Sequence, residues 1–191
     1  YYKFMAFVVT WLLRLLPRNA PVVYKGVNSA LVLCEQVAVL GFTRVLIVTD
    51  DFLGKSGVLD GIKSTLTASG VEFVVFDGVL PDPAFDQVQA GEAVHRSEGC
   101  QAVIAVGGGS VLDAAKMIAM LHTNPGPLKS FDGIQKSKKP GATLFAIPTT
   151  AGTGSEITLA AIITDPVSHR KIPVVDSKMI PGYVAPDAEI M

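Results

Sequence analysis

The sequence has 191 residues, of which 49% are apolar and 17% charged, and its formal net charge is −1. This composition argues against an intrinsically disordered chain, and the absence of a basic stripe argues against nucleic acid as a partner. Two cysteines, Cys34 and Cys100, are too few for a disulfide framework and favour a reducing, cytoplasmic location.

The first twenty residues form a separate N-terminal extension. Residues 4–16 are nearly all apolar and Pro17 follows them, but the run is too short to span a bilayer. We expect an amphipathic helix that packs on the domain or on a second subunit; interfacial membrane contact or a targeting segment is the alternative. The sequence begins with Tyr1 rather than Met, which suggests a fragment, a processed product or a trimmed chain.

From Pro21 onward, short extended runs alternate with helical segments. Asn28 or Ser29 is the expected N-cap of the first helix, and the runs RVLIVT and VEFVVF are typical of strands buried on both faces. Strands are expected at residues 21–25, 44–49, 71–76, 102–106 and 143–147, and helices at 28–40, 57–69, 85–98 and 110–121. Short joints between alternating elements predict an α/β fold: a doubly wound, mainly parallel, Rossmann-like sheet that binds its ligand at the carboxyl ends of the strands.

Two later segments depart from this alternation. Residues 124–140 are rich in glycine, proline and charge, which predicts a surface loop. Residues 157–164 and 171–176 predict a late β-hairpin, with a turn at Asp165 and Pro166.

The strongest local feature is the glycine bend, residues 107–110, between a strand and a helix. Gly107, Gly108 and Gly109 let the backbone approach a pyrophosphate closely, and the helix N-terminus offers unpaired N–H groups with a partial positive charge. Ser110 can cap the helix and donate its hydroxyl to phosphate. The bend therefore predicts a phosphate site; the alternative is a tight turn without a ligand.

Asp113 and Lys116 lie three residues apart on one face of the same helix. One interpretation is an ordinary surface ion pair, which contributes little. The other places Asp113 near the nucleotide, where it braces the loop or holds the nicotinamide end. The spacing alone does not separate the two.

Asp50 ends the first long buried strand, and Asp51 adds a second negative charge. An acid at this position can accept hydrogen bonds from both hydroxyls of an adenosine ribose, and it would repel a 2′-phosphate. The expected cofactor is therefore NAD rather than NADP. A helix cap or a solvated turn is the alternative.

The threonine loop, residues 149–154, follows the strand at 143–147. Its hydroxyls, from Thr149, Thr150 and Thr153 with Ser155 behind them, can bind phosphate or ribose oxygens, and Gly152 and Gly154 make it flexible. A polar linker is the alternative. The three histidines show no metal-ligand spacing and are expected to be solvated or structural.

Three segments together resemble the iron-containing alcohol dehydrogenase family: GGGSVLDAAK at 107–116, PTTAGTGSE at 148–156, and the run at 163–181 with Asp187 after it. The resemblance covers most of residues 21–191. It implies a dinucleotide-binding domain at 21–187, with 188–191 beginning the linker to a helical metal-binding domain that is missing from the chain. It also implies a cytoplasmic enzyme that transfers hydride between NAD and a small alcohol or aldehyde, with Fe²⁺ or another divalent metal such as Zn²⁺. A homodimer or larger homo-oligomer and no membrane association are implied as well.

The resemblance also implies roles for residues of this chain. The adenosine ribose would meet Asp50, the pyrophosphate would lie on Gly108, Gly109 and Ser110 with Asp113 close by, and residues 184–187 would border the cleft. The cofactor would be flanked by Thr149, Thr150 and Thr153, and Lys171 would reach the ribose near the nicotinamide.

Two departures from the family pattern stand out. Asp82 occupies a turn position where the family often has Asn, which replaces an amide donor by an acceptor on the adenine side. The one Asp and three His that hold the family's metal are expected beyond Met191, so this chain alone is expected to be inactive. The alternatives are a catalytically inactive nucleotide-binding remnant or assembly module, and a related reductase such as a maleylacetate reductase.

Overall fold

The computed structural model describes residues 20–191. The helix predicted within residues 4–16 lies outside the described residues. Between residues 20 and 191, no helix is both long and apolar enough to cross a bilayer.

The main sheet has six strands, all parallel, in the order β1-β9-β6-β4-β2-β3. The strands are β1 (Val22–Val23), β2 (Arg44–Val48), β3 (Glu72–Phe76), β4 (Ala102–Gly107), β6 (Thr143–Pro148) and β9 (Tyr183–Val184). Every residue of the central β4 is buried, and four of the five residues of β2 are buried. These continuous apolar runs form strands because helices cover both faces of the sheet.

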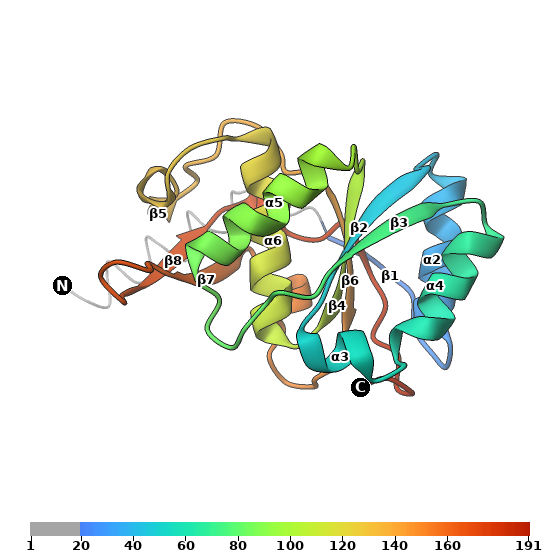
Figure 1. Cartoon of the computed structure of the whole chain (residues 1–191). Coiled ribbons are helices and arrows are strands. Elements are labelled where there is room, and N and C mark those ends of the chain that lie inside the picture. Colours follow the sequence, from blue (N-terminus) through green and yellow to red (C-terminus); the bar gives the residue numbers. More distant parts are fainter. Residues whose placement is uncertain (1–19) are drawn as a thin grey trace.

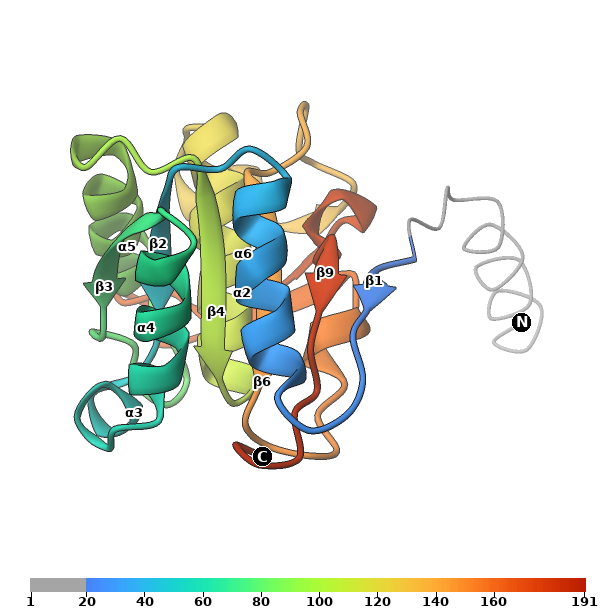
Figure 2. The same ribbon diagram turned by 90° about the vertical axis from the view of Figure 1, so that its right-hand side faces the viewer.

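Helices pack on the two faces of the main sheet, as Figures 1 and 2 show. One apolar core joins the sheet to α2 (Ser29–Val39) and α4 (Leu59–Ala68). The other joins it to α5 (Phe85–Ser97) and α6 (Gly109–Thr123). Cys34 and Cys100 are free thiols in opposite cores. The predicted doubly wound fold is confirmed.

A second, smaller sheet lies beside α6, in the order β5-β8-β7. Strands β7 (Ala160–Thr164) and β8 (Lys171–Val175) are antiparallel, which confirms the predicted hairpin. Its third strand, β5 (Gly133–Ile134), pairs in parallel with β8 and comes from the segment predicted to be a surface loop. That segment also contains the 3₁₀ helix η1 (Leu128–Ser130), so the prediction of a simple loop is wrong.

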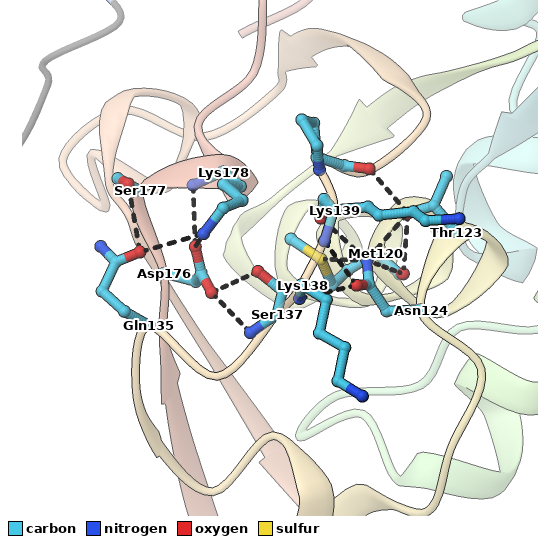
Figure 3. Close-up of polar contacts among 11 residues, drawn as sticks. Met120, Thr123, Asn124, Gln135, Ser137, Lys138, Lys139, Asp176, Ser177 and Lys178 are labelled. Atoms are coloured by element: carbon cyan, nitrogen blue, oxygen red, sulfur yellow. Dashed lines mark hydrogen bonds and ion pairs between the residues drawn. The ribbon is translucent and has the colours of Figure 1, made fainter.

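Polar side chains explain why the segment 124–140 is ordered (Figure 3). The side-chain oxygen of Asn124 accepts hydrogen bonds from the N–H groups of Lys138 and Lys139, at 2.9 and 2.8 Å. Buried Asp176 accepts from the N–H and hydroxyl of Ser137 and from the N–H of Lys178. Burial tends to raise the pKa of Asp176, but these hydrogen bonds outweigh it and hold the pKa below its ordinary value. The segment is therefore held at both ends by side-chain acceptors.

Local predictions failed at four places. Strand β3 is an edge strand without a fully buried residue, so the prediction of burial on both faces is wrong there. The short helix α3 (Asp51–Lys55) was not predicted, nor was β9, whose Tyr183 and Val184 lie between β1 and β6. Asn28 occupies the N-cap position of α2, but its side chain makes no capping hydrogen bond because its backbone is left-handed, with φ 63°.

The N-terminus of α2 is capped by a residue from the far end of the chain. The carboxylate of Asp187 accepts a hydrogen bond from the N–H of Ala30 at 3.2 Å, and Asp187 is buried. The predicted cap by Asn28 or Ser29 is therefore wrong. A side chain 157 residues away satisfies the helix end instead.

Candidate functional site

A cavity of about 730 Å³ opens at the carboxyl ends of β2, β3, β4 and β6. Its size is that of a typical cofactor site. Six of the predicted site residues line it: Asp50, Gly108, Gly109, Ser110, Thr149 and Thr150. The structure thus brings together the glycine bend and the threonine loop, which are forty residues apart in the sequence.

The glycine bend joins β4 directly to α6. A methyl group on Gly107 would lie 2.6 Å from Cβ of Val111, so this glycine is required by internal packing. A methyl group on Gly108 would lie 3.3 Å from Oγ1 of Thr150, and one on Gly109 would lie 3.4 Å from Cγ2 of Thr153. The absence of side chains at Gly108 and Gly109 therefore allows the threonine loop to lie directly against the bend.

The N-terminus of α6 points into the cavity without a side-chain cap. Gly108 is the N-cap residue and no side chain caps the helix, so the prediction that Ser110 caps it is wrong. Ser110 lies in the first turn and lines the cavity. A helix of fifteen residues whose first N–H groups have no capping side chain suits an anionic ligand.

The threonine loop is attached to the bend at its start. Pro148 at the end of β6 pairs with Gly107, and the N–H of Thr149 donates to the carbonyl of Gly107 at 3.1 Å. Further along, Gly152 and Gly154 adopt left-handed backbones with φ 101° and 63° and have open space around them. The loop then continues into the 3₁₀ helix η2 (Ser155–Ile157).

Asp113 and Lys116 do not form a surface ion pair. The side chain of Lys116 is 0% exposed, and its Nζ lies 3.9 Å from Oδ1 of Asp113. The two oxygens of Asp113 accept from the hydroxyl of Ser155 at 2.5 Å and from the N–H of Ile162 at 3.0 Å. Of the two interpretations of Asp113, this geometry favours bracing of the loop.

Asp50 lies where β2 ends and lines the cavity. Its Oδ1 accepts a hydrogen bond from the N–H of Leu53 at 2.8 Å, so it also caps α3. The predicted roles of cavity residue and helix cap are therefore compatible, because a carboxylate has acceptor positions for both. Asp51 also lines the cavity, and its carboxylate pairs with Lys55 within α3.

Asp82 and Lys171 do not line the cavity, although Pro81 next to Asp82 does, and they contact each other. Nζ of Lys171 donates to Oδ1 of Asp82 at 2.6 Å, and both side chains are more than half exposed. Asp82 has a left-handed backbone with φ 55°. The turn at Asp82 lies beside the hairpin of β7 and β8, since the N–H of Thr164 donates to the carbonyl of Pro83 and Thr164 pairs with Lys171.

Sequence reasoning missed the apolar wall of the cavity. Phe52 and Leu53 of α3 form one part of it, and Val79 and Leu80, which follow β3, form another. Ile190 contributes from the C-terminal residues. The position of Val79 and Leu80 just after a parallel strand was the available signal, because ligands bind at that edge of the sheet.

Two of the three histidines lie next to each other, which the sequence did not predict. The rings of His95 and His122 lie 4.2 Å apart between α5 and α6, and Nδ1 of His122 lies 3.3 Å from Oε1 of Glu92, which also pairs with Arg96. Burial lowers the pKa of His95 to about 4, and the neighbouring His122 adds to this shift. Over residues 20–191, no group of three or more His, Cys, Asp or Glu side chains is arranged to hold a metal ion.

Comparisons with known proteins agree with this geometry. Residues 20–188 match the family model described as iron-containing alcohol dehydrogenase. Alcohol dehydrogenase 4 of Schizosaccharomyces pombe is 40% identical over 157 residues, which are 82% of this chain and 37% of that protein. An NAD-dependent methanol dehydrogenase of Bacillus methanolicus is 39% identical over 152 residues, which are 80% of this chain and 40% of that protein.

A solved structure of a 1,3-propanediol oxidoreductase superposes with a TM-score of 0.87 at 35% identity, over 90% of this chain and 45% of that one. The chain spans less than half the length of the relatives it matches. The matched family model and the sequence identities show that the chain belongs to the iron-containing alcohol dehydrogenase family, of which it represents the NAD-binding part.

Proposed function

We propose that this chain binds NAD in the cavity at the glycine bend, and that it serves an enzyme that interconverts a small alcohol and its aldehyde or ketone by hydride transfer. The observation that carries the proposal is the meeting of three features in one cavity. These are the side-chain-free bend, the uncapped N-terminus of α6 and the hydroxyls of the threonine loop.

The pyrophosphate is proposed to lie on the glycine bend. The N–H groups of Gly108, Gly109 and Ser110 and the partial positive charge of α6 favour a doubly charged group there. Thr149 and Thr150 add hydroxyl donors from the facing loop. The residues present therefore fit a dinucleotide diphosphate.

The adenosine end is proposed to lie between α3 and the segment after β3. Phe52 and Leu80 are 77% and 57% exposed, and together they offer apolar surface to a planar base. Asp50, which follows β2 and lines the same cavity, is proposed to accept from the ribose hydroxyls. Its negative charge favours NAD over NADP.

The remaining predicted contacts stay proposals. Thr153 is proposed to flank the cofactor from the threonine loop, while Asp113 acts by bracing that loop. Lys171 is proposed to donate to the ribose near the nicotinamide, in which case its bond to Asp82 is exchanged for one to the cofactor.

When bound, NAD supplies the hydride acceptor for the alcohol carbon. The described residues include no group of side chains that fits a metal ion. The chain's own residues bind and orient the dinucleotide. We therefore expect the 191-residue chain, with Fe²⁺ or Zn²⁺ added, to bind NAD without reducing it in the presence of small alcohols. Measured reduction of NAD by the 191-residue chain would contradict the proposal that it only binds and orients the cofactor.

A homodimer remains a proposal as well. The strand β1 lies at the edge of the main sheet, with Val22 and Val23 both exposed. Among the described residues, only β9 pairs with it. An edge strand of this kind can pair with a second copy of the chain.

The binding proposal is tested with ADP-ribose, which carries the diphosphate and both riboses. Isothermal titration calorimetry of the chain should show saturable binding, and Gly109→Val should abolish it by placing a side chain in the bend. Gly182→Val is the matched control, because Cβ on Gly182 has no neighbour closer than 3.9 Å and lies outside the cavity. Absence of binding by the wild-type chain, or equal binding by Gly109→Val, would overturn the proposal.

The cofactor preference is tested with Asp50→Ser. Serine retains an oxygen that can cap α3 but removes the negative charge. The ratio of NADP to NAD dissociation constants should fall by about tenfold or more, since an unscreened charge contact contributes over 1 kcal/mol. An unchanged ratio would show that Asp50 does not face the ribose.

A further inference from the structure

Lys116 is a fully buried cation beneath the threonine loop. Its side chain is 0% exposed, in the middle of α6. Its Nζ donates to Oγ of Ser155 at 3.3 Å, to Oγ1 of Thr158 at 2.9 Å and to the carbonyl of Ala160 at 2.8 Å. An ammonium group has three N–H donors, and these three hydrogen bonds satisfy all of them.

All three acceptors belong to residues that directly follow the threonine loop in the sequence. The start of that loop is held by the pairing of β6 with β4. Its middle contains Gly152 and Gly154, which have left-handed backbones and no close neighbours. Its end is tied to α6 by Lys116 and by Asp113, which accepts from the same Ser155 hydroxyl. The helix that begins at the glycine bend therefore also fixes the far end of the facing loop.

The buried charge of Lys116 is costly to desolvate, and its three hydrogen bonds offset that cost. Burial lowers the pKa of Lys116 to about 8, while the nearby charges of Asp113 on α6 and Glu156 in η2 raise it. Because the pKa in the folded state is below the ordinary value of 10.5, the unfolded chain holds this proton more tightly. Desolvation of the lysine charge thus opposes folding at neutral pH, but removal of Lys116 alone would leave its buried acceptors without a donor.

We propose that Lys116 is a positioning residue that holds the threonine loop against the glycine bend, so that the loop is preorganised for the diphosphate of the dinucleotide. This inference rests on the proposed function. Lys116 touches no part of the cavity itself and acts through Ser155 and Thr158. Ordering the loop before binding removes an entropy cost from association, which raises affinity without a new contact.

The test compares Lys116→Met with Lys178→Met in the 191-residue chain. Lys178 is a matched control, because it is also bonded to an aspartate but lies in the small-sheet region away from the cavity. For Lys116→Met we expect the dissociation constant for ADP-ribose to rise about tenfold, which corresponds to one or two lost hydrogen bonds. Its thermal midpoint should fall, because the acceptors on Ser155, Thr158 and Ala160 lose their donor, so binding is compared at a temperature at which both variants are folded. Lys178→Met should bind ADP-ribose as the wild type does.

The pH dependence of the wild type provides a second measurement that does not require the variant to fold. Raising the pH from about 7 to about 9.5 removes the ammonium proton, and ADP-ribose should then bind about threefold more weakly. Lys178→Met should show the same profile. Unchanged affinity in folded Lys116→Met, or a flat wild-type profile, overturns the inference while leaving the binding proposal intact. A wild-type chain that does not bind ADP-ribose overturns both.

Discussion

Replacing Asp187 by alanine should destabilise the domain, because this side chain caps a helix from the opposite end of the chain. Asp187 is 2% exposed, and its carboxylate accepts from the N–H of Ala30 at 3.2 Å and from the N–H of Glu189 at 3.2 Å. Its carbonyl also accepts from the N–H of Ile190, which lines the cavity. Loss of the carboxylate leaves a buried helix N–H without an acceptor.

The magnitude follows from these contacts. A hydrogen bond from a buried N–H to a charged acceptor contributes about 1.5 to 3 kcal/mol, and removal of an N-cap costs about 1 kcal/mol by itself. We therefore expect Asp187→Ala to lower the free energy of unfolding by about 2 to 3 kcal/mol. For a domain of this length, each kcal/mol lowers the thermal midpoint by about 2 to 4 °C, so the expected shift is about 5 to 10 °C.

Thermal unfolding followed by far-ultraviolet circular dichroism measures this shift. Asn28→Gly is the contrasting variant, because Asn28 occupies the N-cap position without capping and has a left-handed backbone that glycine adopts readily. Its thermal midpoint should change by less than about 2 °C. If Asn28→Gly were the more damaging of the two, the helix would be capped locally, and the reasoning about Asp187 would be refuted.

Two further predictions concern stability. Because burial, aided by the charge of His122, lowers the pKa of His95 to about 4, the unfolded chain binds this proton more tightly between about pH 6.5 and 4. Urea unfolding should therefore show about 2 kcal/mol less stability at pH 5 than at pH 7, and His95→Phe should remove most of that difference; an unchanged slope would assign it to other groups. Gly107→Ala places a methyl group 2.6 Å from Cβ of Val111 and should cost about 2 to 3 kcal/mol in the same assay, whereas a cost near zero would mean that the bend relaxes freely.

Local sequence patterns predicted most elements of the main sheet but not their positions within it. The runs that form β2 and β3 look equally apolar, yet β2 is central and β3 is at the edge. Burial on one or both faces depends on which strands become neighbours. The unpredicted strand β9 exists because it pairs with β1 and β6, and its two residues carry no periodicity of their own.

In the candidate site, too, the sequence predicted the local features but not the contacts between distant segments. The side-chain-free bend after a strand was visible in the sequence, because glycine and a strand-to-helix junction are local features. The burial of Lys116 was not visible in the sequence, because a lysine three residues after an aspartate looks like part of a surface ion pair. Only the fold brings Ser155 and Thr158 within hydrogen-bonding distance of its Nζ. The apolar wall from Phe52 and Leu80 likewise depended on where two separate segments meet.

By itself, the sequence determined the alternation of strand and helix, the parallel sheet and the two loops at its carboxyl edge. These follow from side-chain periodicity and backbone freedom, which act over a few residues. Only the tertiary structure decided that Asp187 caps α2, that Lys116 is buried and that Asp82 pairs with Lys171. Those contacts join residues 39 to 157 positions apart, and their energies depend on burial and distance, which exist only once the chain has folded.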